Sequence, residues 1–244
     1  MLNLLANNIF LYKMELKIYY RISDKGNIKN KPSYITWENC LRNFITHFHK
    51  KDIHIIADNV EEVTYAKLLK YVSTEQITRT NLGNGNGLAF TFLKAIKENP
   101  DNTFIYFVED DYLHIHNSKQ VLLEGLQRAD YVSLYDHPDK YMNPSPNPFV
   151  KNGGEYTRVI TTNSTHWKNT NSTCMTFATS VKILKQDIDI FLKYTRNLKI
   201  PSSFDVFTYI LPSRNRQLIT PIPSYATHGE TKYLAPFRDW GGVI

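Results

Sequence analysis

"FIYFVEDD", residues 104–111, joins five apolar or aromatic strand-forming residues to three adjacent carboxylates. The apolar run favours a buried strand, in which successive side chains point to opposite faces of the sheet. Three neighbouring acids repel one another, so a strand that ends in them usually offers a cation or a proton a place to bind. The stretch therefore predicts a functional site at the end of a buried strand.

The segments around this strand alternate between strand and helix patterns. In order, they are strand 16–23, helix 33–48, strand 52–59, helix 61–72, a Gly/Asn-rich loop 81–87 leading into a helix, strand 104–111, helix 118–129 and strand 130–138. Such alternation predicts an α/β fold with a mainly parallel sheet and helices on both faces.

The second half of the chain has a different pattern. A Pro/Gly/Asn-rich loop at 143–155 precedes β-rich stretches on either side of "STHWKN" (164–169), and amphipathic helices are predicted at 181–197 and 202–214. A short strand and an irregular tail follow. These features predict a smaller, mixed region after the parallel half, with the change near residue 140.

Composition sets the protein class. Of 244 residues, 42% are hydrophobic and 21% charged, which excludes a disordered chain. Cys40 and Cys174 are far apart with no CxxC pair, which argues against a zinc site or a disulfide framework and for a reducing compartment. The net charge is +6, but the lysines are scattered, so no nucleic-acid partner is expected.

The N-terminal residues favour a protein without a secretory signal. They lack a basic start and a small-residue cleavage site, and no stretch reaches the roughly 18 apolar residues of a membrane span. We expect a cytoplasmic protein, with peripheral contact to a membrane left open. Met14 lies just before the first strand, so residues 1–13 are interpreted as an extension.

Polar side chains follow three predicted strands, at the points where those strands end. They lie in 21–24, in Asp58-Asn59 and in the acidic triplet. In an open parallel sheet such ends meet where ligands bind. Alternation puts Glu109 and Asp111 on one side, with Asp110 turned away. Carboxylate oxygens suit Mn²⁺ or Mg²⁺, which often keep phosphate oxygens as further ligands.

The order of these parts resembles the GT-A glycosyltransferases, in particular the family 2-like enzymes. The resemblance covers residues 15–135 and rests on a strand ending in Asp58, the loop and helix of "GNGNGLAFTFLKAI", and the acidic triplet as an Asp-x-Asp motif. It implies a hexosyltransferase that uses a UDP- or GDP-sugar and a divalent metal. It also implies that Asp58 contacts the base or ribose, Glu109 takes the first motif position and Asp111 binds the metal.

Glutamate at the first position departs from the common motif but keeps the carboxylate. The implied domain spans residues 1–244, with a nucleotide-sugar half at 14–140 and an acceptor half at 141–244. The expected donor-side residues are Arg21, Ser23, Asp58, Glu109, Asp110, Lys232 and Arg238.

Later residues complete the expected site. Since these enzymes often return a histidine to the metal, His228 is the second expected metal ligand. Family 2-like enzymes invert the anomeric centre with a carboxylate base, and Asp205, near the start of a helix that Ser202 or Ser203 can cap, is the candidate. Asp136 and Asp187 are its rivals. Lys232 and Arg238 can hold a diphosphate.

Aromatic residues can stack on a sugar of the acceptor, which we expect to be a glycan or a lipid-linked glycan. Trp167 stands in a polar run, so we expect it at the surface and on the acceptor side. Tyr141 and Trp240 are weaker candidates. Many of the tyrosines must instead lie in the core.

Three other functions compete. Asp101 with Glu109 and Asp111 partly fits a metal-dependent nuclease or phosphodiesterase, although Asp111 stands where such an enzyme has lysine. A sugar-1-phosphate nucleotidyltransferase would share the sheet, but it should have a glycine-rich basic loop after the first strand. A non-catalytic carbohydrate-binding module does not explain the acidic triplet.

Overall fold

The computed structural model describes residues 14–26 and 29–244, so the predicted extension 1–13 lies outside the described residues. The strands are β1 (Leu16–Ile22), β2 (Ile53–Asp58), β3 (Ile77–Thr80), β4 (Phe104–Glu109), β5 (Tyr112–His114), β6 (Tyr131–Val132), β7 (Val159–Thr161), β8 (His166–Asn169), β9 (Phe177–Ser180), β10 (Leu218–Ile222) and β11 (Ala226–His228). The α-helices are α2 (Trp37–His47), α3 (Glu62–Leu68), α4 (Asn84–Glu98), α5 (Ser118–Leu126), α6 (Val181–Lys193) and α7 (Ser203–Ser213).

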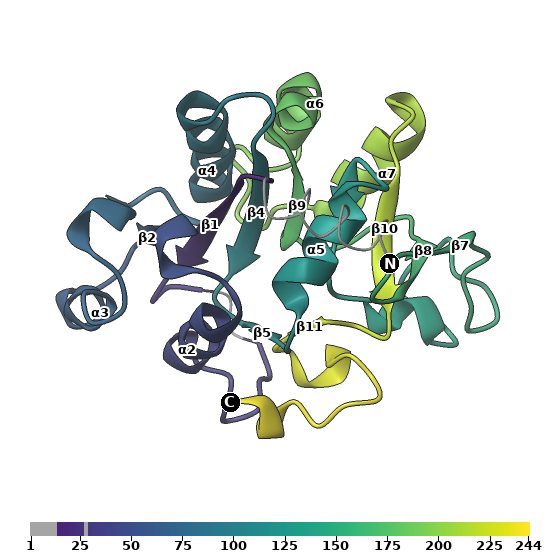
Figure 1. Ribbon diagram of the computed structural model, residues 1–244, viewed down its shortest axis with the longest axis horizontal. Helices are drawn as coiled ribbons and strands as arrows, with labels where there is room; N and C mark the ends of the chain where they lie inside the picture. The colour runs from purple at the N-terminus through teal and green to yellow at the C-terminus, as the bar shows by residue number, and fades with distance from the viewer. Residues whose placement is uncertain (1–13, 27–28) are drawn as a thin grey trace, which may run out of the picture.

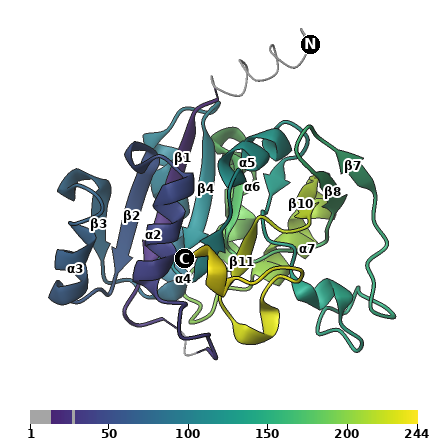
Figure 2. The ribbon, with the colours of Figure 1, turned by 60° about the horizontal axis from the view of Figure 1, so that its bottom comes forward.

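Nine of the strands form one sheet, in the order β3-β2-β1-β4-β9-β6-β10-β8-β7. Strands β3, β2, β1 and β4 are parallel, and β6 and β10 run in the same direction beyond the antiparallel β9. The far edge, β10-β8-β7, is antiparallel. The predicted α/β fold with a mainly parallel sheet is confirmed, and its mixed part lies in the second half of the chain (Figure 2).

Helices cover both faces of the sheet because consecutive residues of its central strands, which point to opposite faces, are apolar. Ile18 and Tyr20 of β1 pack with the buried faces of α2 and α5, while Tyr19 between them packs with α4, α6 and α7. Figure 1 shows α4 and α6 together on one side of β1 and β4, with α2 on the other. The sheet therefore has a hydrophobic core on each face, and the polar groups that follow its strands lie at its edge.

Two differences from the predicted elements affect the site. The stretch 81–87 is only partly a loop, because α4 already begins at Asn84. Gly83 has φ +79°, a conformation that favours glycine, and its carbonyl accepts the first helical hydrogen bond from Gly87 at 2.7 Å. Strand β3 was not predicted, since its four residues are half-exposed and show no clear periodicity.

A second, two-stranded sheet links the acidic triplet to the tail of the chain. Strand β5 begins directly after Asp111 and pairs antiparallel with β11, with His228 opposite Tyr112. This pairing was not predicted, because the tail reads as irregular. It brings residues more than a hundred positions apart to the same edge of the main sheet.

Two further findings concern the whole described chain. Among the described residues, no helix is both long and apolar enough to cross a membrane. Cys40 and Cys174 are both free thiols, and Cys40 is buried.

Candidate functional site

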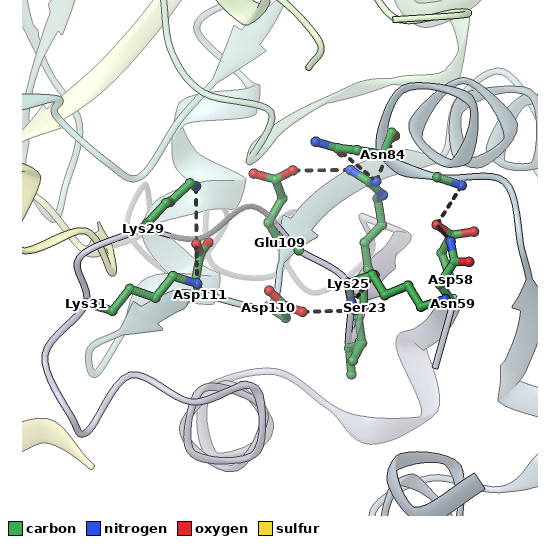
Figure 3. Close-up of a pocket in the computed structure, with 14 residues that line it drawn as sticks. Ser23, Lys25, Lys29, Lys31, Asp58, Asn59, Asn84, Glu109, Asp110 and Asp111 are labelled. Carbon is green, nitrogen blue, oxygen red and sulfur yellow. Dashed lines mark hydrogen bonds and ion pairs between the residues drawn. The ribbon is translucent and has the colours of Figure 1, made fainter. Parts of the chain in front are cut away.

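A cavity of about 280 Å³ lies at the carboxyl ends of β1, β2 and β4. Its lining comprises Arg21, Ile22, Ser23, Lys25, Gly26, Lys29, Lys31, Asp58, Asn59, Gly83, Asn84, Glu109, Asp110 and Asp111. Figure 3 shows their polar side chains converging from three strand ends and the start of α4. The predicted meeting of the polar strand ends is therefore observed, at the edge where open parallel sheets bind ligands.

Arg21 and Glu109 stand opposite each other on β1 and β4. The Arg21 Nη1 atom lies 3.2 Å from Glu109 Oε1, and Nη2 donates to both the backbone and side-chain oxygens of Asn84 at 3.0 Å. The guanidinium thus ties β4 to the first turn of α4. Asn84 was not predicted, since it lay within a stretch interpreted as loop.

Asp58 organises the chain that precedes α4. Its carboxylate accepts hydrogen bonds from the backbone N–H groups of Leu82 and Gly83, at 2.7 and 3.0 Å, and from the Thr80 hydroxyl at 2.8 Å. The Asn59 amide is a fourth donor, at 2.8 Å. These four bonds fill the usual acceptor capacity of a carboxylate. Contact with a base or ribose stays a prediction.

The acidic triplet does not continue the alternation of β4. The strand ends at Glu109, so Asp110 lies in the turn, and all three side chains line the cavity (Figure 3). The expectation that Asp110 turns away is wrong for this reason. Its carboxylate accepts from the backbone N–H of Ser23 at 3.0 Å. Burial and the neighbouring Asp111 raise the pKa of Asp110 above its usual range.

Asp111 is 4% exposed and meets three nitrogen-bearing side chains at one oxygen. Its Oδ2 lies 2.9 Å from Lys31 Nζ, 3.4 Å from Lys29 Nζ and 3.2 Å from His228 Nε2. Burial alone would raise the pKa of Asp111, but His228 and then the two lysines hold it well below the usual range. The sequence indicated neither lysine.

The residues present can be compared with the needs of a divalent cation. Asp111 Oδ1 and His228 Nδ1 are buried without a hydrogen-bond partner in the described structure. Across residues 14–26 and 29–244, however, no three His, Cys, Asp or Glu side chains come together as a metal site. Asp111 and His228 therefore offer two protein donors, which fits a cation whose other ligands are phosphate oxygens and water.

Other predicted residues lie outside the cavity lining. Lys232 and Arg238 are exposed and stand over the rings of Tyr233 and Trp240, at 5.4 and 5.9 Å. Asp205 is exposed in the first turn of α7, where Ser202 caps the helix. Their roles stay predictions.

The two rival bases are buried in ion pairs. Asp187 is fully buried and accepts from the Tyr131 hydroxyl at 2.6 Å and from Arg216 Nε at 3.0 Å. Asp136 lies 2.9 Å from Lys168 Nζ and also accepts from the Tyr141 hydroxyl. Both contribute to packing between elements.

The prediction of an exposed Trp167 is wrong. It is fully buried on β8, where its indole N–H donates to Thr162 Oγ1 at 3.0 Å. Gly125 of α5 packs against the ring so closely that a Cβ there would lie 2.7 Å from it. The polar residues around Trp167 concealed a side chain that fills the space under α5. Trp240 is also buried, whereas Tyr141 is 45% exposed.

The structure also separates the acids of the nuclease alternative. Asp101 lies before the amino end of β4, is exposed, and pairs with Lys185 at 2.5 Å. Glu109 and Asp111 lie at the opposite end of that strand. Since the three carboxylates cannot share one metal, the arrangement expected for that nuclease is absent.

Comparison of the sequence with protein-family models and with curated proteins gives no match. Solved structures do match the fold. A structure of GalNAc-T7 with UDP, GalNAc and Mn²⁺ superimposes with a TM-score of 0.56 at 10% identity, covering 88% of this chain. S. aureus TarS (residues 1–349) and a 4-diphosphocytidyl-2C-methyl-D-erythritol synthase from Anaerococcus prevotii both give 0.48, at 15% and 11% identity, covering 85% and 97% of this chain.

The chain spans 43% of the GalNAc-T7 chain, 58% of the TarS chain and 96% of the synthase chain. At these identities the comparison concerns fold and not activity. The sheet order, the helices on both faces and the superposition on GalNAc-T7 all indicate the same fold. The chain has a GT-A-like fold.

Proposed function

We propose that this protein transfers a sugar from a nucleoside-diphosphate sugar, with UDP or GDP as the nucleotide, to a glycan or lipid-linked glycan. The observation that carries the proposal is the cavity at the strand ends, where four basic side chains and the acidic triplet converge in a GT-A-like fold. A diphosphate is the leaving group that such a charge arrangement suits. The proposal includes that the protein is of the family 2-like type and that Glu109-Asp110-Asp111 is its Asp-x-Asp motif.

The donor-binding roles follow from position. Glu109 holds Arg21, which faces the cavity, and Asp58 shapes the entry to α4. Mn²⁺ or Mg²⁺ would be held by Asp111 and His228, and it would supply neutralisation of the departing diphosphate. Metal dependence of turnover is part of the proposal. The structure of GalNAc-T7, which is similar in fold, contains UDP, GalNAc and Mn²⁺, and this supports metal dependence by analogy.

We further propose that Asp205 is the base that takes the acceptor proton, in an inverting reaction. Contacts of the preceding segment support this. The backbone N–H of Asn197 donates to Asn86 Oδ1 at 2.8 Å, and Gly85 packs against the carbonyls of Thr195 and Leu198. The connection that leads to Asp205 thus lies against the first turn of α4. Residues 14–140 would bind the donor and 141–244 the acceptor.

The test is release of UDP or GDP from a panel of nucleotide-sugars, with and without Mn²⁺. Asp111→Asn is expected to lower release at least a hundredfold while the protein still folds, with a lower unfolding midpoint because a buried, ion-paired carboxylate is lost. Asp101→Asn, at the other end of β4, is the matched control and should release nucleotide normally. Pyrophosphate formation from a nucleoside triphosphate and a sugar 1-phosphate would indicate the nucleotidyltransferase instead.

A further inference from the structure

Two ammonium groups share one carboxylate oxygen at the edge of the cavity. Lys31 Nζ lies 2.9 Å and Lys29 Nζ 3.4 Å from Asp111 Oδ2. A single carboxylate carries one negative charge, so the pair keeps a surplus of positive charge. Lys29 also lies 2.9 Å from His228 Nε2.

Three other acids line the cavity, and each has a partner of its own. Asp110 accepts the backbone N–H of Ser23 at 3.0 Å. Glu109 is paired with Arg21, and the Asp58 carboxylate accepts two backbone N–H groups along with the Thr80 hydroxyl. None of these three acids forms an ion pair with Lys29 or Lys31, whose carboxylate partner is Asp111.

The two lysines are accessible to a ligand. Their side chains are 29% and 28% exposed, while the Asp111 side chain beneath them is 6% exposed. Figure 3 shows both extending from the segment after β1 toward Asp111, beside Glu109. An anion that enters the cavity can contact the ammonium groups without displacing a buried group.

A metal held by Asp111 and His228 would lie beside these lysines. Lys29 and Lys31 contact the Oδ2 atom of Asp111, and Lys29 contacts the Nε2 atom of His228, whereas Asp111 Oδ1 and His228 Nδ1 have no hydrogen-bond partner in the described structure. In the part of the chain that the structure describes, no third acid, His or Cys side chain completes a metal site with this pair. Lys29 and Lys31 themselves thus supply positive charge at this place in the cavity.

We infer that Lys29 and Lys31 bind the diphosphate of the donor and that the donor binds without a divalent cation. The inference rests on the proposed function and deepens it. Asp111 acts as a positioning residue, since it holds both ammonium groups at the cavity edge. A divalent cation held by Asp111 and His228 can still act in turnover, because the inference concerns binding alone.

The experiment is calorimetric titration of the purified protein with UDP and with GDP, in EDTA and in Mn²⁺. The wild type should bind one of them in EDTA with an affinity within tenfold of that in Mn²⁺. Lys29→Ala/Lys31→Ala should weaken binding in EDTA at least tenfold, and Lys29→Arg/Lys31→Arg should retain it. Lys17→Ala is the matched control, because Lys17 pairs with Glu15 at the amino end of β1.

Each outcome decides something. Binding by the wild type only in Mn²⁺ would overturn the inference and leave the proposed function standing. Equal binding by the wild type and the double alanine variant would also overturn it. Binding of neither nucleotide under any condition would overturn the proposed function itself. If the double variant does not fold, the single variants and the wild-type comparison in EDTA give the answer.

Discussion

Arg21 on β1 and Glu109 on β4 face each other across two parallel strands, and their charged atoms lie 3.2 Å apart. The same guanidinium holds Asn84 at the start of α4 through two hydrogen bonds of 3.0 Å. One side chain therefore fixes the position of the first acid of the triplet relative to the helix that borders the cavity.

Arg21→Ala should destabilise the protein and weaken nucleotide binding. The change leaves Glu109 and the Asn84 oxygens without their donor in a half-buried place, which costs about 1–3 kcal/mol. Urea unfolding measures the loss, and titration with UDP or GDP measures binding. Arg79→Ala, which breaks the exposed pair with Glu62, should change neither. Equal effects of the two variants would contradict this account of Arg21.

Gly85→Ala should disrupt the start of α4. A Cβ at this position would lie 2.1 Å from the Leu198 carbonyl oxygen and 2.3 Å from that of Thr195, both on the backbone, so the elements must move apart. We expect a loss of about 1–3 kcal/mol in unfolding free energy and weaker nucleotide binding. Gly154→Ala is the control, because a Cβ there has open space. Full stability of Gly85→Ala would refute the close packing.

Trp167→Ala should cost about 3–5 kcal/mol of stability, as expected for a buried tryptophan. The fully enclosed ring and its bond to Thr162 give the reason. Trp167→Phe should cost less, and Tyr156→Ala, at a fully exposed ring, should cost nothing measurable. Thermal or urea unfolding, measured together with activity, decides whether Trp167 packs in the core or stacks on a sugar. If Trp167→Ala abolished activity with unchanged stability, the ring would belong to a binding surface.

Stability should fall in acid because of His114. Burial, and then the charge of His47, lower the pKa of this fully buried histidine from 6.5 to about 3. The contribution of neutral His114 to the free energy of unfolding is therefore complete above pH 6.5 and is lost as the pH falls toward 3. At pH 5 the loss is about 2 kcal/mol. In His114→Gln, which keeps a partner for the Tyr106 hydroxyl, unfolding free energy should change less between pH 7 and pH 5. Parallel curves for both proteins would contradict this.

Much of the parallel half could be predicted because its strands are buried on both faces and its helices are amphipathic. The strands ending at Ile22, Asp58 and Glu109 follow from local patterns, and so does the convergence of their polar ends. Lys29 and Lys31 could not be predicted. They lie in a segment without periodicity, and only the folded chain brings them to Asp111.

The later part of the site depended on tertiary pairing. His228 reaches Asp111 because β11 pairs with β5, a register that the tail does not reveal. Trp167 was misplaced for the opposite reason, since its polar neighbours suggested a surface while packing under α5 buried the ring. Local polarity is a weak guide where a short strand lies between two others.

The central claim is that the cavity beside Asp111 binds a nucleoside diphosphate. It is tested most directly by thermal unfolding with UDP, GDP and their sugars, each with and without Mn²⁺. A ligand that binds only the folded state stabilises it by about 2.7 kcal/mol at a hundredfold excess over its dissociation constant. We predict a higher midpoint with one base and its sugars, and no such rise in Lys29→Ala/Lys31→Ala. Unchanged midpoints with every nucleotide would contradict the claim.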